Sequence, residues 1–184
     1  MAVSAKNRRK IIDKLLVSLG IIGAVVLIGM GSLAWWTYSF TSSNVRTQLA
    51  EQKIYFPPKG SPELASPQIG PFLDQYAGQQ LLTGPEAKAY ADHFIAVHLS
   101  EVADGQTYAQ VSAELQANPT NPQLQQEAQV LFQGETARGL LLGNAYAFSN
   151  IAYVAEVIAI VLLVAGGLML LLVMMGLAHI AKSL

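Results

Sequence analysis

Two long apolar segments dominate the pattern of hydrophobic and polar positions along the chain. Residues 15–38 carry no charge, and a second uncharged segment follows Glu156 and runs to Ala178. Each exceeds the roughly 18 apolar residues that indicate a membrane-spanning helix. At 1.5 Å per residue, each reaches about 30 Å, the thickness of a bilayer's hydrocarbon core. The pattern therefore predicts transmembrane helices over residues 15–38 and 151–179.

The polar region between these segments changes pattern at Thr83. Before it, the stretch "FPPKGSPELASPQIGP" is rich in proline, which removes backbone donors and disfavours helix. Residues 39–82 are therefore predicted to be a short helical extension followed by a proline-rich arm. Apolar residues pin this arm, and Tyr55 and Phe56 are candidate interaction residues, together with Glu135, Arg138 and Glu156. From Thr83 the apolar positions recur at helical spacing, and Glu86 completes a capping box. Residues 83–150 are predicted to form a small helical domain.

The last helix of this domain has a clear start and no clear end. Asn121 and Pro122 are start signals, and helical spacing then continues to about Ala181. The second span is thus predicted to be continuous with a long protruding helix. Three glycines in it indicate a bend or the close approach of another helix. They are Gly134, Gly139 and Gly143.

The charge distribution predicts the orientation. Residues 1–14 carry five basic side chains and one acidic one, whereas the region between the spans carries ten acidic and five basic residues. Cytoplasmic flanks collect Lys and Arg. We therefore expect an all-α membrane protein in the cell membrane, with residues 1–14 and 180–184 cytoplasmic and the middle domain extracytoplasmic. The first span is too long for a cleaved signal peptide, and Trp35, Trp36, Tyr38 and Tyr153 are predicted to lie at the membrane interface.

The amino-acid composition limits the kinds of binding and metal sites that the chain can form. Only 12% of the residues are charged, the net charge is −1 and there is no cysteine. These values give no sign of a nucleic-acid partner and exclude disulfides and thiolate metal sites. The densest group of potential ligands is "DHFIAVHLSEVAD", but His93 and His98 are five residues apart and do not share a helix face. We find no catalytic motif, and we expect neither enzymatic activity nor a cofactor or metal.

Glu156 is the single charged residue in the segment 139–178. An ionisable residue within a span is a functional hypothesis by default. Counting back about 20 residues from His179 places the outer boundary near Ala159, so we favour an interfacial position for Glu156. A buried contact to a partner's cation and a proton relay are the alternatives. Glu135 and Arg138 are spaced to pair on one face and to contact the earlier helices.

Three blocks of the middle region resemble a family of small two-span membrane proteins of actinobacteria. These blocks are "AKAYADHFIAVHL", "DGQTYAQVS" and "LFQGETARGLLLGNAYAF". The resemblance covers most of residues 52–148 and implies the same two-span architecture. Some members of this uncharacterised family carry a ring-opening dioxygenase label, but this sequence offers no adequate set of iron ligands. Gln106 and Gln133 stand where the family pattern has lysine and arginine.

Two classes of function remain open. The first is a non-catalytic accessory subunit or assembly factor that binds other integral-membrane subunits of a respiratory or transport complex. Small residues in both spans suit helix packing, either with partner helices or between the two spans. They are Gly20, Gly23, Ala24, Gly29, Gly31, Ala165, Gly166 and Gly167. The alternative is an extracytoplasmic ligand-binding or sensing module, which would need a pocket in the middle domain.

Overall fold

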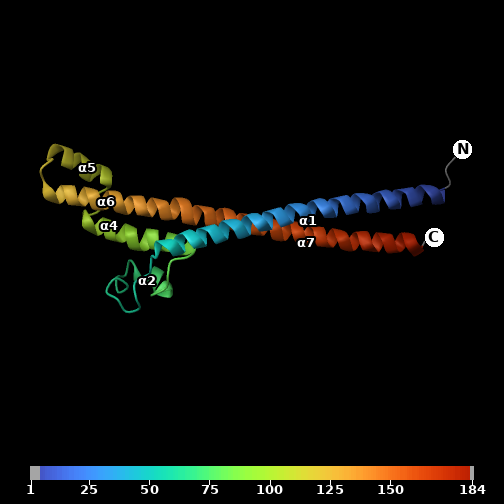
Figure 1. The fold of residues 1–184 in the computed structure, drawn as a ribbon, viewed down its shortest axis with the longest axis horizontal. Coiled ribbons are helices and arrows are strands. Elements are labelled where there is room, and N and C mark those ends of the chain that lie inside the picture. The colour runs from blue at the N-terminus through green and yellow to red at the C-terminus, as the bar shows by residue number, and fades with distance from the viewer. Residues whose placement is uncertain (1–4, 183–184) are drawn as a thin grey trace. The chain divides into compact units, whose positions relative to one another are not determined.

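The computed structural model describes residues 5–182. The outermost parts of the two predicted cytoplasmic ends, residues 1–4 and 183–184, lie outside the described residues. Within the described range the chain is helical, with one isolated β-bridge between Tyr55 and Gln80 (Figure 1). The helices are α1 (Ala5–Gln52), α2 (Gly70–Leu73), the 3₁₀-helix η1 (Asp74–Tyr76), α3 (Gly84–Tyr90), the π-helix η2 (Ala91–Ile95), α4 (Ala96–Val102), α5 (Tyr108–Ala117), α6 (Pro122–Leu140), the π-helix η3 (Leu141–Tyr146) and α7 (Ala147–Lys182).

The described chain divides into two compact units. The span unit consists of α1 up to Phe40 and α7 from Ala152 onward, and the domain unit is Thr41–Ile151. Both long helices are long and apolar enough to cross a membrane. Most of their large apolar side chains, such as Leu33 and Met175, are exposed. A surface of this kind is stable in lipid and costly in water, in agreement with the two predicted spans.

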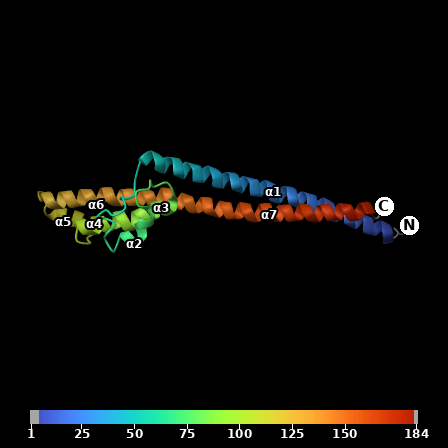
Figure 2. The same cartoon turned by 90° about the horizontal axis from the view of Figure 1, so that it is seen from below.

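Within the span unit α1 and α7 lie side by side and antiparallel (Figure 2). Glycines make this packing close, because a Cβ added at Gly31 would lie 2.9 Å from Leu163 Cγ, and one at Gly166 would lie 2.7 Å from Ile28 Cγ1. Gly20 and Gly176 meet α7 and α1 in the same way. Several of the small residues in the spans therefore pack the spans against each other. Others do not: Gly29 and Gly167 have nothing within 4 Å of an added Cβ.

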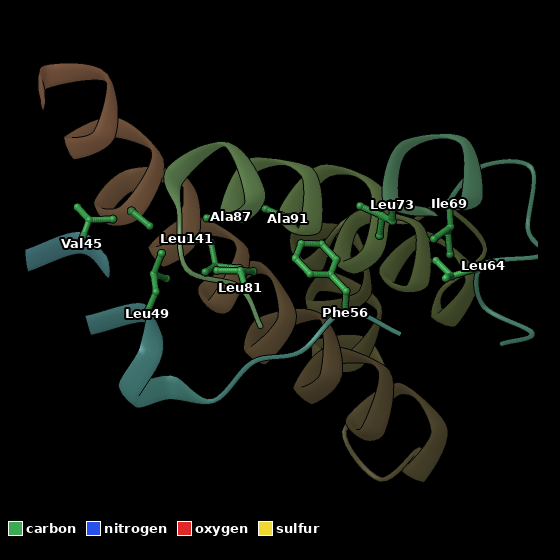
Figure 3. Packing of buried hydrophobic residues seen from close by; sticks show 11 residues of the cluster. Val45, Leu49, Phe56, Leu64, Ile69, Leu73, Leu81, Ala87, Ala91 and Leu141 are labelled. Atoms are coloured by element: carbon green, nitrogen blue, oxygen red, sulfur yellow. The ribbon is translucent and has the colours of Figure 1, made fainter. Parts of the chain in front are cut away.

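The larger core of the domain unit joins the end of α1, the arm, α3 and η3 (Figure 3). Its fully buried leucines are Leu73 and Leu81, and Figure 3 shows Phe56 among them. Three backbone hydrogen bonds join the two ends of the arm, from Phe56 N to Gln79 O at 2.9 Å, from Gly78 N to Pro57 O at 3.0 Å and from Leu81 N to Ile54 O at 2.9 Å. Phe56 is thus part of the domain's own core and not an exposed contact for a partner. Helix α2 begins at Gly70, inside the segment predicted to be an irregular arm.

A second, smaller core joins α4, α5 and α6. Its buried residues are Leu99, Ala103, Val111, Ala128 and Leu131. Gly134 allows the close approach of α4, since an added Cβ would lie 2.4 Å from Leu99 Cδ2. Of the three glycines in the long helix, Gly134 therefore marks a close approach. Gly139 and Gly143 are open.

The predicted helix signals are confirmed. Thr83 and Glu86 form a complete capping box, and Asn121 accepts hydrogen bonds from the first backbone amides of α6. The long helix predicted from Pro122 is also confirmed, and it continues to Lys182. The helical run that begins after Thr83 contains the π-helix η2 and ends at Val102, with Asp104 and Gly105 at positive φ.

Candidate functional site

Four charged side chains join α3 and η2 to α6. Asp92 bonds Lys88 through one carboxylate oxygen, and its other oxygen lies 3.3 Å from Arg138 Nη2. Arg138 Nη1 in turn lies 3.5 Å from Glu135 Oε2, as the spacing of these two residues predicted. Lys88 Nζ also lies 5.6 Å from the centre of the Tyr146 ring. This ionic cluster connects segments 46 residues apart, and Asp92 is its centre.

The cluster perturbs two of its own groups. The hydrogen bond from Lys88 lowers the pKa of Asp92 below its ordinary value of 3.8, with Arg138 adding to the effect. The same bond to Asp92 raises the pKa of Lys88 above 10.5. Each charged form is therefore favoured by folding. The stabilisation from Asp92 is fully present above pH 3.8 and is lost as the pH falls through the lowered pKa.

We expect Asp92→Asn to lower the melting temperature of the full-length protein in detergent at neutral pH. The difference from the unchanged protein should shrink as the pH falls below 3.8 and through the lowered pKa of Asp92, because the carboxyl group then becomes neutral in the folded state as well. Glu101→Gln is the matched control, since Glu101 is exposed and forms no ion pair with the described residues. Melting curves at pH 3 to 7 measure this. A difference that stays constant with pH would show that Asp92 acts through packing instead of charge.

Two π-helices lie beside this cluster. Asp92 and His93 belong to η2, and Tyr146 ends η3. Each π-helix inserts an extra residue into a turn, which shifts the side chains that follow to another face of the helix. π-Helical turns are rare and occur often at functional sites. Here they place the η2 and η3 side chains around one groove.

The groove has a volume of about 530 Å³ and is open to solvent. Its lining residues are Pro71, Phe72, Gln75, Pro85, Lys88, Ala89, His93, Tyr146 and Asn150. The Phe72 ring stacks flat on the His93 ring, with centroids 3.7 Å apart. The walls are thus mainly apolar and aromatic. Five of the described lining residues have side chains that can donate hydrogen bonds, and none of the described lining residues is a carboxylate; the donors are Gln75, Lys88, His93, Tyr146 and Asn150.

The two histidines of the domain serve different contacts. His93 lines the groove, whereas the Nδ1 atom of His98 lies 2.7 Å from the backbone oxygen of Phe94. In residues 5–182, no three His, Asp or Glu side chains come together in a way that could hold a metal ion. His98 therefore has a local structural contact in its own helix.

The contacts of the span unit fix the register of α7 against α1. Gly31 meets Leu163 and Ile28 meets Gly166. Continuing this antiparallel register by two turns brings half-buried Glu156 level with Tyr38. The Tyr38 ring lies 5.4 Å from the Trp35 ring, and Tyr153 is exposed. Glu156 is therefore level with the aromatic residues expected at the outer membrane interface, and its interfacial position stays a prediction.

We expect Glu156→Gln to be tolerated, because an interfacial carboxylate is hydrated and makes little net contribution to stability. The change should alter the unfolding free energy by no more than about 0.5 kcal/mol. Glu156→Asp, which keeps the charge but shortens the reach, should behave alike. The measurement is retention of co-purifying subunits and thermal stability in detergent. Loss of a partner with glutamine alone would indicate a buried cation left unpaired, which costs about 3–5 kcal/mol.

Tyr55 and Phe56, the other two candidate interaction residues, differ in their exposure to solvent. Tyr55 is 57% exposed and free to contact a partner, whereas Phe56 is 2% exposed. Sequence reasoning missed the groove, because its lining comes from six helical elements, which are α2, η1, α3, η2, η3 and the start of α7. Lys88 was the one available signal, since it precedes Asp92 by four residues on a predicted helix. Nothing local indicated Phe72 or Asn150.

Comparisons of the chain with known proteins found no relative. No protein-family model, curated protein or solved structure matches the chain. Function therefore has to be argued from the surfaces and contacts of the chain itself.

Proposed function

We propose that this protein is a non-catalytic accessory subunit or assembly factor of a larger integral-membrane complex of respiratory or transport type. The proposal includes the orientation argued from charge, with both ends cytoplasmic and the domain unit extracytoplasmic. It also includes membership of the actinobacterial two-span family that the sequence resembles. In this orientation Tyr55 and the outer part of the long helix are available to neighbouring subunits.

One observation carries the proposal: an open face on the long helix of the domain unit. Gly139 and Gly143 lie four residues apart and have nothing within 4 Å of an added Cβ. Leu140 and Phe148 are exposed on the same stretch, by 57% and 50%. Small residues let another helix approach closely, and the neighbouring apolar side chains then lose contact with water. The open face thus has the features of a helix-packing surface without a partner in this chain.

The experiment is purification in mild detergent at native expression, comparing Gly139→Leu with Ala113→Leu. Both place a leucine at an exposed helical position, but only Gly139 lies on the open face. Gly139→Leu should lose a stoichiometric partner that Ala113→Leu retains, while both keep the stability of the isolated protein. Recovery of the unchanged protein as a lone monomer, or equal retention by both variants, would count against the subunit proposal.

The groove favours a second candidate function, an extracytoplasmic ligand-binding or sensing module anchored by two spans. The groove supplies the pocket that such a function requires, and its lining is independent of the open face. The two functions are therefore compatible in one complex.

A further inference from the structure

We infer that the groove between α2, α3, η2 and η3 binds the anionic phosphate headgroup of a membrane lipid. This inference goes beyond the subunit proposal, because the groove shares no residue with the open face. It would give the alternative ligand-binding function a definite class of ligand. Three features of the groove support this ligand, which are its walls, its hydrogen-bond donors and its place in the chain.

The walls suit an amphiphile. Phe72, Pro71, Pro85, Ala89 and Tyr146 present apolar and aromatic surface. The stacking of Phe72 on His93 makes one wall flat and rigid. Ligand sites typically combine such apolar walls with a few placed polar groups. A fully hydrated free anion would gain nothing from these walls, whereas the glycerol backbone of a lipid would.

The donors suit an anion. Lys88 is the only lining residue with a fixed charge, and Gln75, His93 and Asn150 can each donate a hydrogen bond. Lys88 uses one of its three hydrogens for Asp92, and its Nζ lies over the Tyr146 ring at the groove. Its remaining hydrogens are available to a ligand. Asp92 carries one negative charge and pairs with two cations, Lys88 and Arg138. It therefore does not fully neutralise Lys88.

The place in the chain favours a lipid over a free phosphate. Asn150 directly precedes the apolar residues of α7 that begin with Ile151. Tyr146 lies one helical turn before Asn150. At 1.5 Å per residue, Asn150 lies about 9 Å beyond Glu156, which is level with the expected outer interface, so this end of the groove lies near the outer edge of the headgroup layer. The inferred ligand is therefore an anionic phospholipid of the leaflet next to the domain.

The test uses the full-length protein in a nonionic detergent, with dihexanoyl phosphatidylglycerol as the anionic probe. Dihexanoyl phosphatidylcholine has the same chains and phosphate but no net charge, and inorganic phosphate represents the free anion. Native mass spectrometry of each titration gives the apparent Kd. Phosphatidylglycerol should bind about tenfold more tightly than phosphatidylcholine, because the quaternary ammonium of choline offsets the phosphate charge beside Lys88 and no described lining residue is a carboxylate that could pair with it. Inorganic phosphate should bind weakest.

Four variants separate the groove from lipid bound elsewhere on the spans. Lys88→Gln should weaken phosphatidylglycerol binding about tenfold, while Lys59→Gln, at an exposed lysine outside the groove, should not. Asp92→Asn breaks the same ion pair but keeps the cation, so binding should persist or tighten. Ala89→Leu fills the groove without changing charge and should weaken binding of both lipids.

Three results would overturn the inference. They are equal affinity for the two lipids, equal losses in Lys88→Gln and Lys59→Gln, and no measurable binding of either lipid. Inorganic phosphate binding as tightly as phosphatidylglycerol would show a free-anion site instead. A loss of binding in Asp92→Asn equal to that in Lys88→Gln would show that the ion pair acts only by holding the fold. None of these outcomes depends on whether a partner subunit co-purifies.

Discussion

Replacing Leu81 by alanine is expected to lower the free energy of unfolding of the domain unit by about 2–5 kcal/mol. Leu81 is fully buried, and it lies in the core that joins the end of α1, the arm, α3 and η3. The substitution removes buried apolar surface and leaves a cavity that the surrounding helices fill only in part. Because typical domains are stable by only 5–15 kcal/mol, a loss of this size is a large fraction of the total.

The matched control is Leu140→Ala, at a leucine that is 57% exposed. This change should alter stability by no more than about 0.5 kcal/mol. Chemical denaturation of the full-length protein in detergent, followed by circular dichroism, measures both. Equal effects of the two substitutions would show that Leu81 does not lie in a packed core. The arm would then be held by its hydrogen bonds and not by buried apolar packing.

Local signals allowed much of the helical fold to be predicted from the sequence. The capping box of Thr83 and Glu86 involves residues three apart, and the start of α6 at Pro122 depends on its immediate neighbour Asn121. The spans follow from long uncharged runs, which need no knowledge of the rest of the chain. In each case the physical cause and its structural effect lie within one continuous segment of the chain.

The parts that could not be predicted depend on contacts between distant residues. Phe56 lies in a proline-rich segment with no helical pattern, so nothing local distinguishes a core residue from an exposed contact. Its burial comes from Tyr76 and Tyr90, whose ring centres lie 5.0 and 5.5 Å away. Arg138 was expected to contact an earlier helix, and it contacts Asp92 in η2. The identity of this partner could not be predicted, because it lies 46 residues away in the sequence. Composition does not select one acid among several.

The π-helices show a different limit. No proline or glycine pattern marks η2, and its sequence "ADHFI" is compatible with an ordinary α-helix. A single inserted residue nevertheless changes which side chains face the groove beyond that point. The predicted helix over this region was therefore nearly right in length, while the side chains that line the candidate site could not be assigned to it.

The glycines of the span unit give the sharpest remaining test, because neighbouring glycines have opposite environments. Leucines at Gly31 and Gly166 should disrupt the packing of α1 on α7, while leucines at Gly29 and Gly167 should not. A Cβ at Gly31 would lie 3.1 Å from the backbone nitrogen of Leu163, which cannot move without shifting α7. Overpacking of this kind costs about 1–3 kcal/mol at each site.

The readout uses the absence of native cysteine. Cysteines introduced at Gly20 and Val173 should cross-link readily on oxidation, since an added Cβ at Gly20 lies 2.8 Å from Val173 Cγ2 and the second substitution removes that methyl group. A combined cost of about 2 kcal/mol lowers the paired population roughly 30-fold relative to the separated one. The Gly31→Leu/Gly166→Leu protein should therefore cross-link much more slowly than the Gly29→Leu/Gly167→Leu protein. Equal rates would mean that the two spans are held together by the rest of the chain, and that the small residues of both spans are free to pack against other subunits.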